Sequence, residues 1–422
     1  MTEAEWVHHA VWWQVYPLGF AGAYPEHDNG GLRRLGAWLD YVIELGASGL
    51  LLGPIFAAET HGYDTLDHFR IDPRLGDDGD FDALIAAAHQ RGLRVVLDGV
   101  FNHVGRGHPA FQDVLAQGEA AATARWFRRR GGGEFVTFEG HDALVTLNHL
   151  EPAVVDYVVE VMTHWLRRGA DGWRLDAAYA VPPAFWAKVL PRVRAEFPQA
   201  YVFGEVIHGD YPAIVELSTL DSVTQYELWK AIWSSLESAN FFELSWALER
   251  HNGFLDTFVP QTFVGNHDVT RLASRLGDER LVPLAVAVLL TVGGTPSIYS
   301  GDEQGFRGVK EDRAGGDDAV RPPFPAEPAG LAPYGRQLHR IHQELIALRR
   351  RNAWLHRART RTLHLTNEQF VYEAYADGNA LVIALNAAPK PATVPAPSGG
   401  TVELAPCSWS VLPSGEAVTG PG

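Results

Sequence analysis

The sequence predicts an α/β fold: a closed (β/α)8 TIM barrel with a short insertion after its third strand, followed by a C-terminal antiparallel β-sandwich domain. First, strand-like and helical patterns alternate along the chain to about residue 350. Second, the strand candidates are mostly apolar, as expected of parallel strands covered on both faces. Third, short segments of alternating polarity replace this pattern after about residue 354. An open doubly wound sheet is the alternative, but no glycine-rich nucleotide-binding turn follows the first strand.

Eight short segments have the composition of barrel strands. They span residues 11–16, 49–52, 94–98, 172–176, 201–205, 222–225, 262–265 and 297–299. Between and after them, apolar residues recur at the spacing of amphipathic helices. These helical patterns span residues 32–45, 80–91, 152–168, 183–197, 226–238, 241–251, 281–291 and 334–350. Such alternation is typical of a parallel barrel.

An unusually long segment separates the third strand candidate from the next helical pattern. Insertions at this end of a barrel strand overhang the active site, and a short helix is predicted within this one at residues 119–130. We therefore predict a barrel over residues 1–103 and 148–352, an inserted subdomain over residues 104–147, and a C-terminal β domain over residues 353–422.

Four strand candidates deliver a carboxylate at or near their C-terminal end: Asp98, Asp176, Glu205 and Asp268. An ionised carboxylate is costly to hold beside an apolar core. The C-terminal ends of barrel strands meet at one face, where catalytic residues lie. One such acid is most simply explained by a salt bridge or a helix cap, but four in succession favour a shared site. Cleaving a glycosidic bond with retention needs two carboxyl groups roughly 5–5.5 Å apart, about the spacing of neighbouring strands.

The composition narrows the classes of partner. A formal net charge of −16 disfavours nucleic acids and anionic membranes, because both would be repelled. Aromatic residues make up 11% of the chain, enough for a large core and for flat surfaces that suit sugar rings. Cys407 is the single cysteine, which excludes an intramolecular disulfide and a thiolate metal cluster. No signal peptide, membrane span or histidine metal site is predicted, so we expect a cytoplasmic protein without a bound metal.

Seven short motifs in a fixed order resemble those of glycoside hydrolase family 13, the α-amylase family, over nearly the whole chain. They are residues 61–65 (HGYDT) with 71–73 (IDP), 98–103 (DGVFNH), 147–148 (LN), 172–176 (GWRLD), 204–206 (GEV), 264–268 (VGNHD) and 294–303 (GTPSIYSGDE). One motif alone is a weak signal, whereas the full set in family order is a strong one. The motifs and the short insertion look most like the cyclomaltodextrinase/neopullulanase branch, without that branch's additional N-terminal domain.

The resemblance implies a role for each acid. Asp176 would attack the anomeric carbon and form a covalent glycosyl-enzyme, and Glu205 would protonate the leaving oxygen and then deprotonate water. Asp268 would bind sugar hydroxyls and stabilise the charge that develops on the ring. Asp98 resembles a structural acid that supports Arg174, which would keep Asp176 ionised. The substrate-binding residues that the resemblance implies are Tyr63, His103, Arg174, His267, Asp317 and Arg321; a solvated surface pair is the alternative for the last two.

These residues predict a retaining hydrolase that cleaves α-1,4-glucosidic bonds of maltooligosaccharides or cyclic maltodextrins. The alternatives are a glucanotransferase or sugar isomerase of the same family, or a catalytically silent carbohydrate-binding subunit, which would usually lack one reacting acid. No cofactor is expected: some family members bind calcium near the position of Asn102, but residues 177–180 (AAYA) replace a calcium ligand that many members have. The expected partner is an oligosaccharide, and the expected state is a monomer or homodimer.

Overall fold

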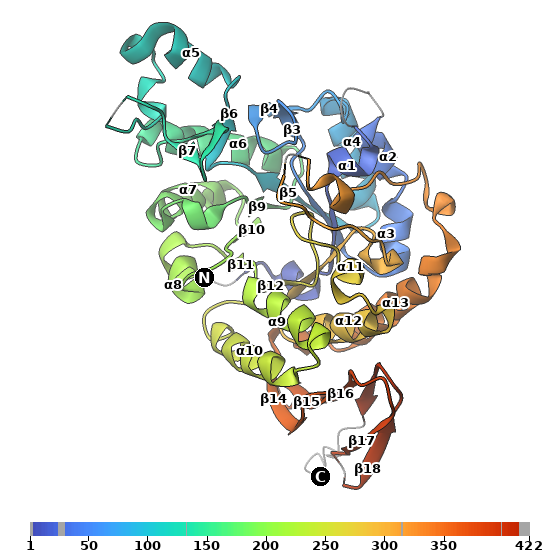
Figure 1. Cartoon of the computed structure of the whole chain (residues 1–422). Helices are drawn as coiled ribbons and strands as arrows, with labels where there is room; N and C mark the ends of the chain where they lie inside the picture. Colours follow the sequence, from blue (N-terminus) through green and yellow to red (C-terminus); the bar gives the residue numbers. More distant parts are fainter. Residues whose placement is uncertain (1–2, 24–29, 132, 314, 398, 413–422) are drawn as a thin grey trace.

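The computed structural model describes residues 3–23, 30–131, 133–313, 315–397 and 399–412. At its centre is a barrel of eight parallel strands (Figure 1). In chain order these are β1 (Trp12–Val15), β2 (Gly49–Leu52), β5 (Arg94–Gly99), β9 (Gly172–Leu175), β10 (Tyr201–Gly204), β11 (Ser222–Val223), β12 (Gln261–Phe263) and β13 (Thr295–Tyr299). Strand β13 pairs with β1, and a bridge between Thr224 and Gln261 closes the gap between β11 and β12. The predicted TIM barrel is confirmed.

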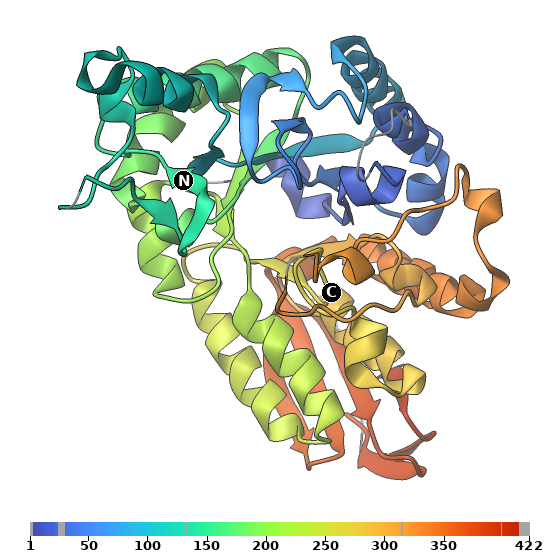
Figure 2. The ribbon, with the colours of Figure 1, turned by 45° about the horizontal axis from the view of Figure 1, so that its top comes forward.

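Helices surround this barrel (Figures 1 and 2). They are α1 (Pro17–Ala21), α2 (Gly31–Gly36), α3 (Leu39–Leu45), α4 (Asp78–Gln90), α6 (Pro152–Arg167), α7 (Pro183–Glu196), α8 (Tyr211–Ser218), α9 (Tyr226–Glu237), α10 (Phe241–Phe254), α11 (Leu272–Leu276), α12 (Val282–Thr291) and α13 (Arg336–Arg351). The pattern predicted at residues 32–45 is divided between α2 and α3. Helix α8 was absent from the predicted pattern, and it begins where the Asp210 side chain accepts a hydrogen bond from the Ala213 N–H.

Alternate residues of the barrel strands face inward and outward. Trp12 and Tyr201 stack inside the barrel with ring centroids 6.4 Å apart, whereas Trp13 and Trp173 pack among the residues of the main core. Gly49 pairs with Trp12, and a Cβ atom at this glycine would lie 2.5 Å from the tryptophan ring. Trp12 and Tyr201 are the first residues of β1 and β10, so these large rings fill the end of the barrel opposite to the C-terminal strand ends.

Two insertions stand at the C-terminal ends of the strands. The first is a hairpin of β3 (Phe56–Ala58) and β4 (Thr65–Ile71), and the second contains α5 (Pro109–Gln117) and a sheet of β6 (His103–Gly105), β7 (Thr137–Phe138) and β8 (His141–Thr146). The helix predicted at residues 119–130 is wrong. The α-helix lies earlier because Pro109 occupies its first turn and His108 caps it, and Gly118, with φ of 63°, ends it.

The C-terminal domain packs on the barrel as a small sandwich, as predicted. A four-stranded sheet contains β14 (Arg359–Leu365), β15 (Gln369–Ala376), β16 (Asn379–Asn386) and β19 (Ser408–Leu412), and a second sheet contains β17 (Ala392–Pro395) and β18 (Thr401–Leu404). Along β15, Tyr372 faces the barrel and its hydroxyl lies 2.6 Å from Thr291 Oγ1 on α12. The neighbouring Val371 faces the other way, against Val394 and Leu404. Because successive side chains of a strand point to opposite faces, β15 packs against the barrel with one face and against the second sheet with the other.

Candidate active site

The predicted acids converge at the C-terminal end of the barrel. Asp98 lies in β5, Asp176 directly follows β9 and Glu205 directly follows β10, and these three strands are neighbours in the barrel. Asp268 reaches the same place from the loop after β12. Asp176, Glu205 and Asp268 line one cavity of about 340 Å³. The four strand ends therefore deliver their acids to one site.

The guanidinium group of Arg174 contacts three of these carboxylates. Its Nη1 lies 2.7 and 2.6 Å from the two carboxylate oxygens of Asp98 and 3.4 Å from Asp176 Oδ1. Its Nη2 lies 2.7 Å from Glu205 Oε1. Burial opposes the charge of Arg174, but Asp98 and then Glu205 outweigh burial and raise the pKa of Arg174 well above its ordinary value. Arg174 is therefore a permanent cation that orients the acids around it.

Asp176 and Glu205 act as a coupled pair. Burial, and then the charge of Glu205, raise the pKa of Asp176 well above its ordinary value despite the opposing charge of Arg174. Two buried carboxylates that interact this strongly do not ionise independently, so the pair retains one proton into a higher pH range. Glu205 Oε2 also accepts a 3.0 Å hydrogen bond from the Ala177 N–H. Ala177 adopts a left-handed backbone, with φ of 45°, a strained conformation that aims this N–H at the acid.

Asp268 is kept ionised by its neighbours. Burial alone would raise the pKa of Asp268, but His267 and then Arg321 outweigh burial and hold the pKa well below its ordinary value. Arg321 Nη2 lies 2.7 Å from Asp268 Oδ1, and His267 Nε2 lies 3.0 Å from Oδ2. The Asp268 side chain is still 28% exposed, so a carboxylate remains available to a ligand in the cavity.

Tyr63, which lines the cavity, lies side by side with the buried His267. Their rings are parallel with centroids 5.7 Å apart, and the Tyr63 hydroxyl hydrogen-bonds His267 Nε2. The same hydroxyl donates a 3.1 Å bond to Asp98 Oδ2, and His267 Nδ1 lies 3.2 Å from Gln14 Nε2. Tyr63 lines the cavity, where the ring is available to a sugar. Its role in stacking remains a prediction.

His103 lines the cavity, but both of its ring nitrogens contact protein groups. Nε2 lies 3.0 Å from the Tyr63 carbonyl oxygen and Nδ1 lies 3.1 Å from Asn102 Nδ2. Burial lowers the pKa of His103 to about 3, so the ring is neutral at neutral pH. Nε2 therefore donates to the carbonyl and Nδ1 accepts from the amide. The sugar contact predicted for His103 requires one of these bonds to be given up.

Asp317 and Arg321 occupy different environments. They lie 3.1 Å apart, but the Arg321 side chain is 8% exposed and that of Asp317 is 31% exposed. Arg321 lies beneath Asp268 and also donates a 2.9 Å hydrogen bond to the His267 carbonyl oxygen. Asp317 instead extends to Lys310, 3.2 Å away. Arg321 is thus placed to support Asp268, a contact that the sequence prediction of a sugar-binding pair did not include.

Sequence reasoning missed several of the side chains that line the cavity. Phe138 and Glu139 come from the second insertion, Tyr179 from the turn after β9, and Tyr226 from the start of α9. The Tyr179 hydroxyl donates a 2.7 Å hydrogen bond to Glu139 Oε1, which joins the insertion to the barrel. No motif marks these residues. For Tyr226, its position directly after the strand predicted at residues 222–225 is the signal that could have found it.

One group of three candidate metal ligands converges within the described part of the chain: Glu3, His8 and His356. It lies outside the cavity, and Arg357 Nη2 already approaches the Glu3 carboxylate at 3.0 Å. Asn102, the position linked to calcium by the resemblance, has its amide directed at His103. The expectation that no cofactor is needed stays a prediction.

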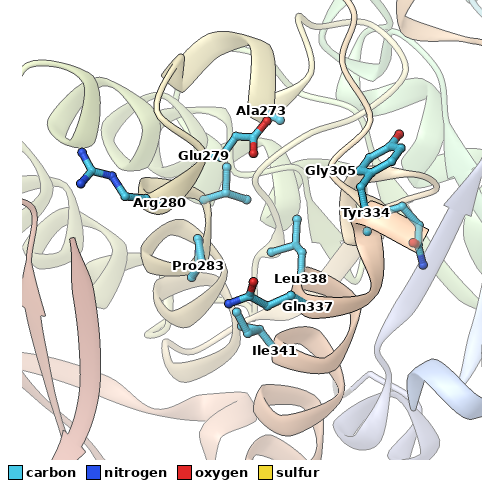
Figure 3. Close-up of a pocket in the computed structure, with 12 residues that line it drawn as sticks. Ala273, Glu279, Arg280, Pro283, Gly305, Tyr334, Gln337, Leu338 and Ile341 are labelled. Atoms are coloured by element: carbon cyan, nitrogen blue, oxygen red, sulfur yellow. The ribbon is translucent and has the colours of Figure 1, made fainter. Parts of the chain in front are cut away.

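A second cavity, of about 260 Å³, lies between α12 and α13 (Figure 3). Tyr334, Pro283 and Leu338 contribute to its walls, and Glu279 is its one carboxylate among the lining residues. Glu279 pairs with Arg307 at 2.6 Å. A single, paired carboxylate does not supply an acid–base pair, so the chemistry is assigned to the first cavity.

A (β/α)8 barrel whose strand ends bring two coupled carboxyl groups, a third ionised carboxylate and a buried arginine into one cavity has the parts of a glycoside hydrolase. The family model described as alpha amylase, catalytic domain, matches residues 14–134 and 122–326. The chain belongs to the α-amylase family, glycoside hydrolase family 13, and is an enzyme of that family.

Several known proteins are similar to this chain. A cyclomaltodextrinase of Geobacillus thermopakistaniensis is 33% identical over 93% of this chain and 71% of its own length. Neopullulanase 2 of Thermoactinomyces vulgaris is 32% identical over 88% of this chain and 68% of its own length. The structure of a cyclic α-maltosyl-(1→6)-maltose hydrolase from Arthrobacter globiformis matches with a TM-score of 0.87 and 26% identity, covering 98% of this chain and all of that one. The predicted resemblance to the cyclomaltodextrinase/neopullulanase branch is confirmed. In the described part of the chain, no helix is long and apolar enough to cross a bilayer.

Proposed function

We propose that the protein is a retaining hydrolase that cleaves α-1,4-glucosidic bonds of maltooligosaccharides or cyclic maltodextrins. The observation that carries this proposal is the bridge made by Arg174, whose two terminal nitrogens contact Asp176 and Glu205. One planar group thereby orients both the nucleophile and the acid. The substrate class is supported by the names of the similar proteins, which include a cyclomaltodextrinase and a neopullulanase.

In the first half of the reaction, the Asp176 carboxylate attacks the anomeric carbon and Glu205 gives its proton to the glycosidic oxygen. The bond between that oxygen and the anomeric carbon breaks, and the shortened sugar leaves with the proton. The single proton of the pair must therefore sit on Glu205 when the bond breaks. Asp268, held ionised by Arg321 and His267, stabilises the positive charge that develops on the sugar ring.

In the second half, Glu205 is a carboxylate and takes a proton from water. The water oxygen attacks the anomeric carbon and releases Asp176. The Arg174 guanidinium and the Ala177 N–H both contact Glu205 and stabilise its ionised form. A sugar hydroxyl in place of water would give a transferase, which is the alternative predicted from the sequence.

The pH dependence of activity follows from the coupled pair. Activity requires one proton on the pair. Without a proton, Glu205 cannot act as an acid; with two protons on the pair, Asp176 is neutral and cannot attack. Because the pKa of Asp176 is raised, the pair keeps that proton well above the range of an ordinary carboxyl group, about pH 4. We expect a bell-shaped profile of kcat/KM whose alkaline limb falls as pH rises through this raised value. An alkaline limb near pH 4 would contradict the coupling.

A panel of substrates tests the proposed reaction. Maltotriose, maltopentaose, cyclodextrins and pullulan are incubated with the enzyme, and products are identified by chromatography with and without added maltose. We expect cleavage of α-1,4 bonds with products that first appear as α-anomers, because two inversions give retention. Release of β-anomers, or no cleavage of any of these glucans, would overturn the proposal. Longer products in the presence of maltose would instead identify a transferase.

The similarity to the Arthrobacter globiformis structure favours a second candidate substrate. That protein is named for the hydrolysis of a cyclic tetrasaccharide containing α-1,6 linkages, and this chain covers it completely. Including the cyclic tetrasaccharide in the same panel distinguishes the two candidates. Preferred cleavage of this substrate over cyclodextrins would assign the enzyme to that specificity.

We propose a cytoplasmic location on the basis of an intracellular maltogenic amylase of Bacillus subtilis, which is 32% identical over 73% of this chain and 57% of its own length. Fractionation of the native host cells tests the location. Sedimentation of the purified protein tests the expected monomer or homodimer.

A further inference from the structure

Tyr226 lies directly against the proposed acid, although the mechanism above does not use it. It is the first residue of α9, and Thr224 and Gln225 separate it from β11, the sixth barrel strand. Its hydroxyl donates a 3.2 Å hydrogen bond to Glu205 Oε1, the oxygen that Arg174 also contacts. Phe263 and Trp229 pack against its ring at 4.9 and 5.6 Å between centroids. The hydroxyl is therefore held in place by a buried, tightly packed ring.

The direction of this hydrogen bond is fixed by Asn266. The Asn266 Oδ1 accepts a 2.9 Å hydrogen bond from the Asp268 N–H, so the amide nitrogen must be the end that faces Tyr226. This Nδ2 donates to the Tyr226 hydroxyl oxygen at 3.0 Å. Because the hydroxyl oxygen already receives a hydrogen from Asn266, its own hydrogen points to Glu205. Backbone, amide, hydroxyl and carboxylate thus form one directed chain.

We propose that Tyr226 is a positioning residue for the acid–base step: it donates a fixed hydrogen bond to the ionised form of Glu205 and thereby sets the orientation and proton balance of that carboxyl group. This inference rests on the proposed function, in which Glu205 is the acid and then the base. Asn266 lies in the loop that also carries Asp268, and it bonds both the Tyr226 hydroxyl and the Asp268 N–H. It therefore fixes the position of Glu205 relative to Asp268.

Other charged or titratable groups also face Glu205, and their effects on its ionisation are the same in the wild type and in the variants described below. They are Arg174, Asp176, Asp98 and Tyr179 near the carboxylate, with Asp268 and Lys310 lining the same cavity. Burial, and then the charge of Glu205, raise the pKa of Tyr226 well above its ordinary value. Tyr226 therefore stays protonated, and hence a donor, throughout the working pH range.

Replacing Tyr226 by phenylalanine removes the donor and keeps the ring. We expect kcat/KM on maltopentaose to fall roughly tenfold, the size expected for one hydrogen bond to a charged group. The alkaline limb of the pH profile should move upward by up to about one pH unit, because without this donor the Asp176–Glu205 pair loses its single proton less readily. Both are measured by initial rates between pH 4 and about pH 9, a range wide enough for shifted carboxyl groups.

A substrate with a better leaving group separates positioning of the acid from a contact with sugar. For a nitrophenyl α-maltoside, departure of the phenolate needs little help from an acid. We expect Tyr226→Phe to lose much less kcat/KM on this substrate than on maltopentaose. Equal losses on both substrates with an unmoved alkaline limb would overturn the inference, as would wild-type rates on both.

Two further variants make the test independent of folding. Tyr372→Phe removes another buried tyrosine hydroxyl, the one that contacts Thr291, and should leave rates and pH profile unchanged. Asn266→Ala should act in the same direction as Tyr226→Phe, although it also removes the acceptor of the Asp268 N–H. The double variant should lose less than the sum of the two single losses, because the effect of Asn266 on Glu205 passes through Tyr226. Additive losses in the double variant would contradict that chain of hydrogen bonds.

The proposed function and this inference fail in distinguishable ways. A wild-type enzyme that cleaves neither maltopentaose nor the nitrophenyl maltoside overturns the proposed function and the inference with it. A wild-type enzyme that cleaves both, combined with an unmoved pH profile in Tyr226→Phe, overturns the inference alone.

Discussion

Asp176→Asn and Glu205→Gln are each expected to lower kcat on maltooligosaccharides by at least about 10³-fold, measured as initial rates of sugar release. The asparagine amide is too poor a nucleophile to form the glycosyl ester, and the glutamine amide has no acidic proton to give to the leaving oxygen. Both substitutions keep the size of the side chain, so the fold is retained and the loss is chemical. The contacts with Arg174 are weakened in both variants, and Glu205→Gln also changes the hydrogen bonds from the Ala177 N–H and the Tyr226 hydroxyl.

The two variants should differ on a nitrophenyl α-maltoside. Glu205→Gln should still form the covalent intermediate, because nitrophenolate leaves without an acid, and should then stall for want of a base. Asp176→Asn should form no intermediate, and mass spectrometry of the quenched protein distinguishes the two outcomes. Asp171→Asn is the matched control: this acid lies at the opposite end of β9, bonded to Arg94 and the Val95 N–H, and its loss should leave turnover near the wild-type value. Near-normal turnover by Asp176→Asn would refute its assignment as the nucleophile.

Arg174→Leu is expected to remove activity and also to lower the free energy of unfolding by about 3–5 kcal/mol, the usual effect of breaking a buried ion pair. The cause is Asp98, whose side chain is completely buried and loses both of its short contacts with the guanidinium. Chemical denaturation with urea measures the change. Adding Asp98→Asn to Arg174→Leu should recover part of the loss, because a neutral amide replaces the unpaired charge.

An exposed arginine provides the comparison for this stability effect. Arg192 pairs with Asp156 on the surface at 2.6 Å, with both side chains about half exposed or more. Arg192→Ala should change the free energy of unfolding by less than about 1 kcal/mol. Equal stability losses in Arg192→Ala and Arg174→Leu would show that the buried acids do not depend on Arg174 for their charge.

The barrel and the acids of the site were predictable because their signals are local. Apolar runs of four or five residues mark the strands, and an acid at the end of such a run marks the strand end that faces the cavity. The order of the motifs then identified the family. The inserted helix was misplaced because its start depends on Pro109 and the His108 cap, which no hydrophobic period reveals.

The supporting contacts could not be predicted from the sequence. Arg321 binds Asp268, and Tyr226 receives its hydrogen bond from Asn266, across separations of 53 and 40 residues. Whether such side chains meet depends on the closure of the barrel and the path of its loops. A motif records that an acid is present, but not which residue holds it or which oxygen accepts a hydrogen bond.

By itself, then, the sequence determined the barrel, the C-terminal sandwich, the family and the identity of the candidate acids, because short-range patterns of polarity specify strands and strand ends. Only the tertiary structure decided the environment of each acid: Asp176 coupled to Glu205, Asp268 held ionised by Arg321 and His267, and Asp98 buried against Arg174. The physical reason is that burial and the distance to neighbouring charges set the protonation of a carboxyl group, and both arise only when distant segments of the chain are packed together.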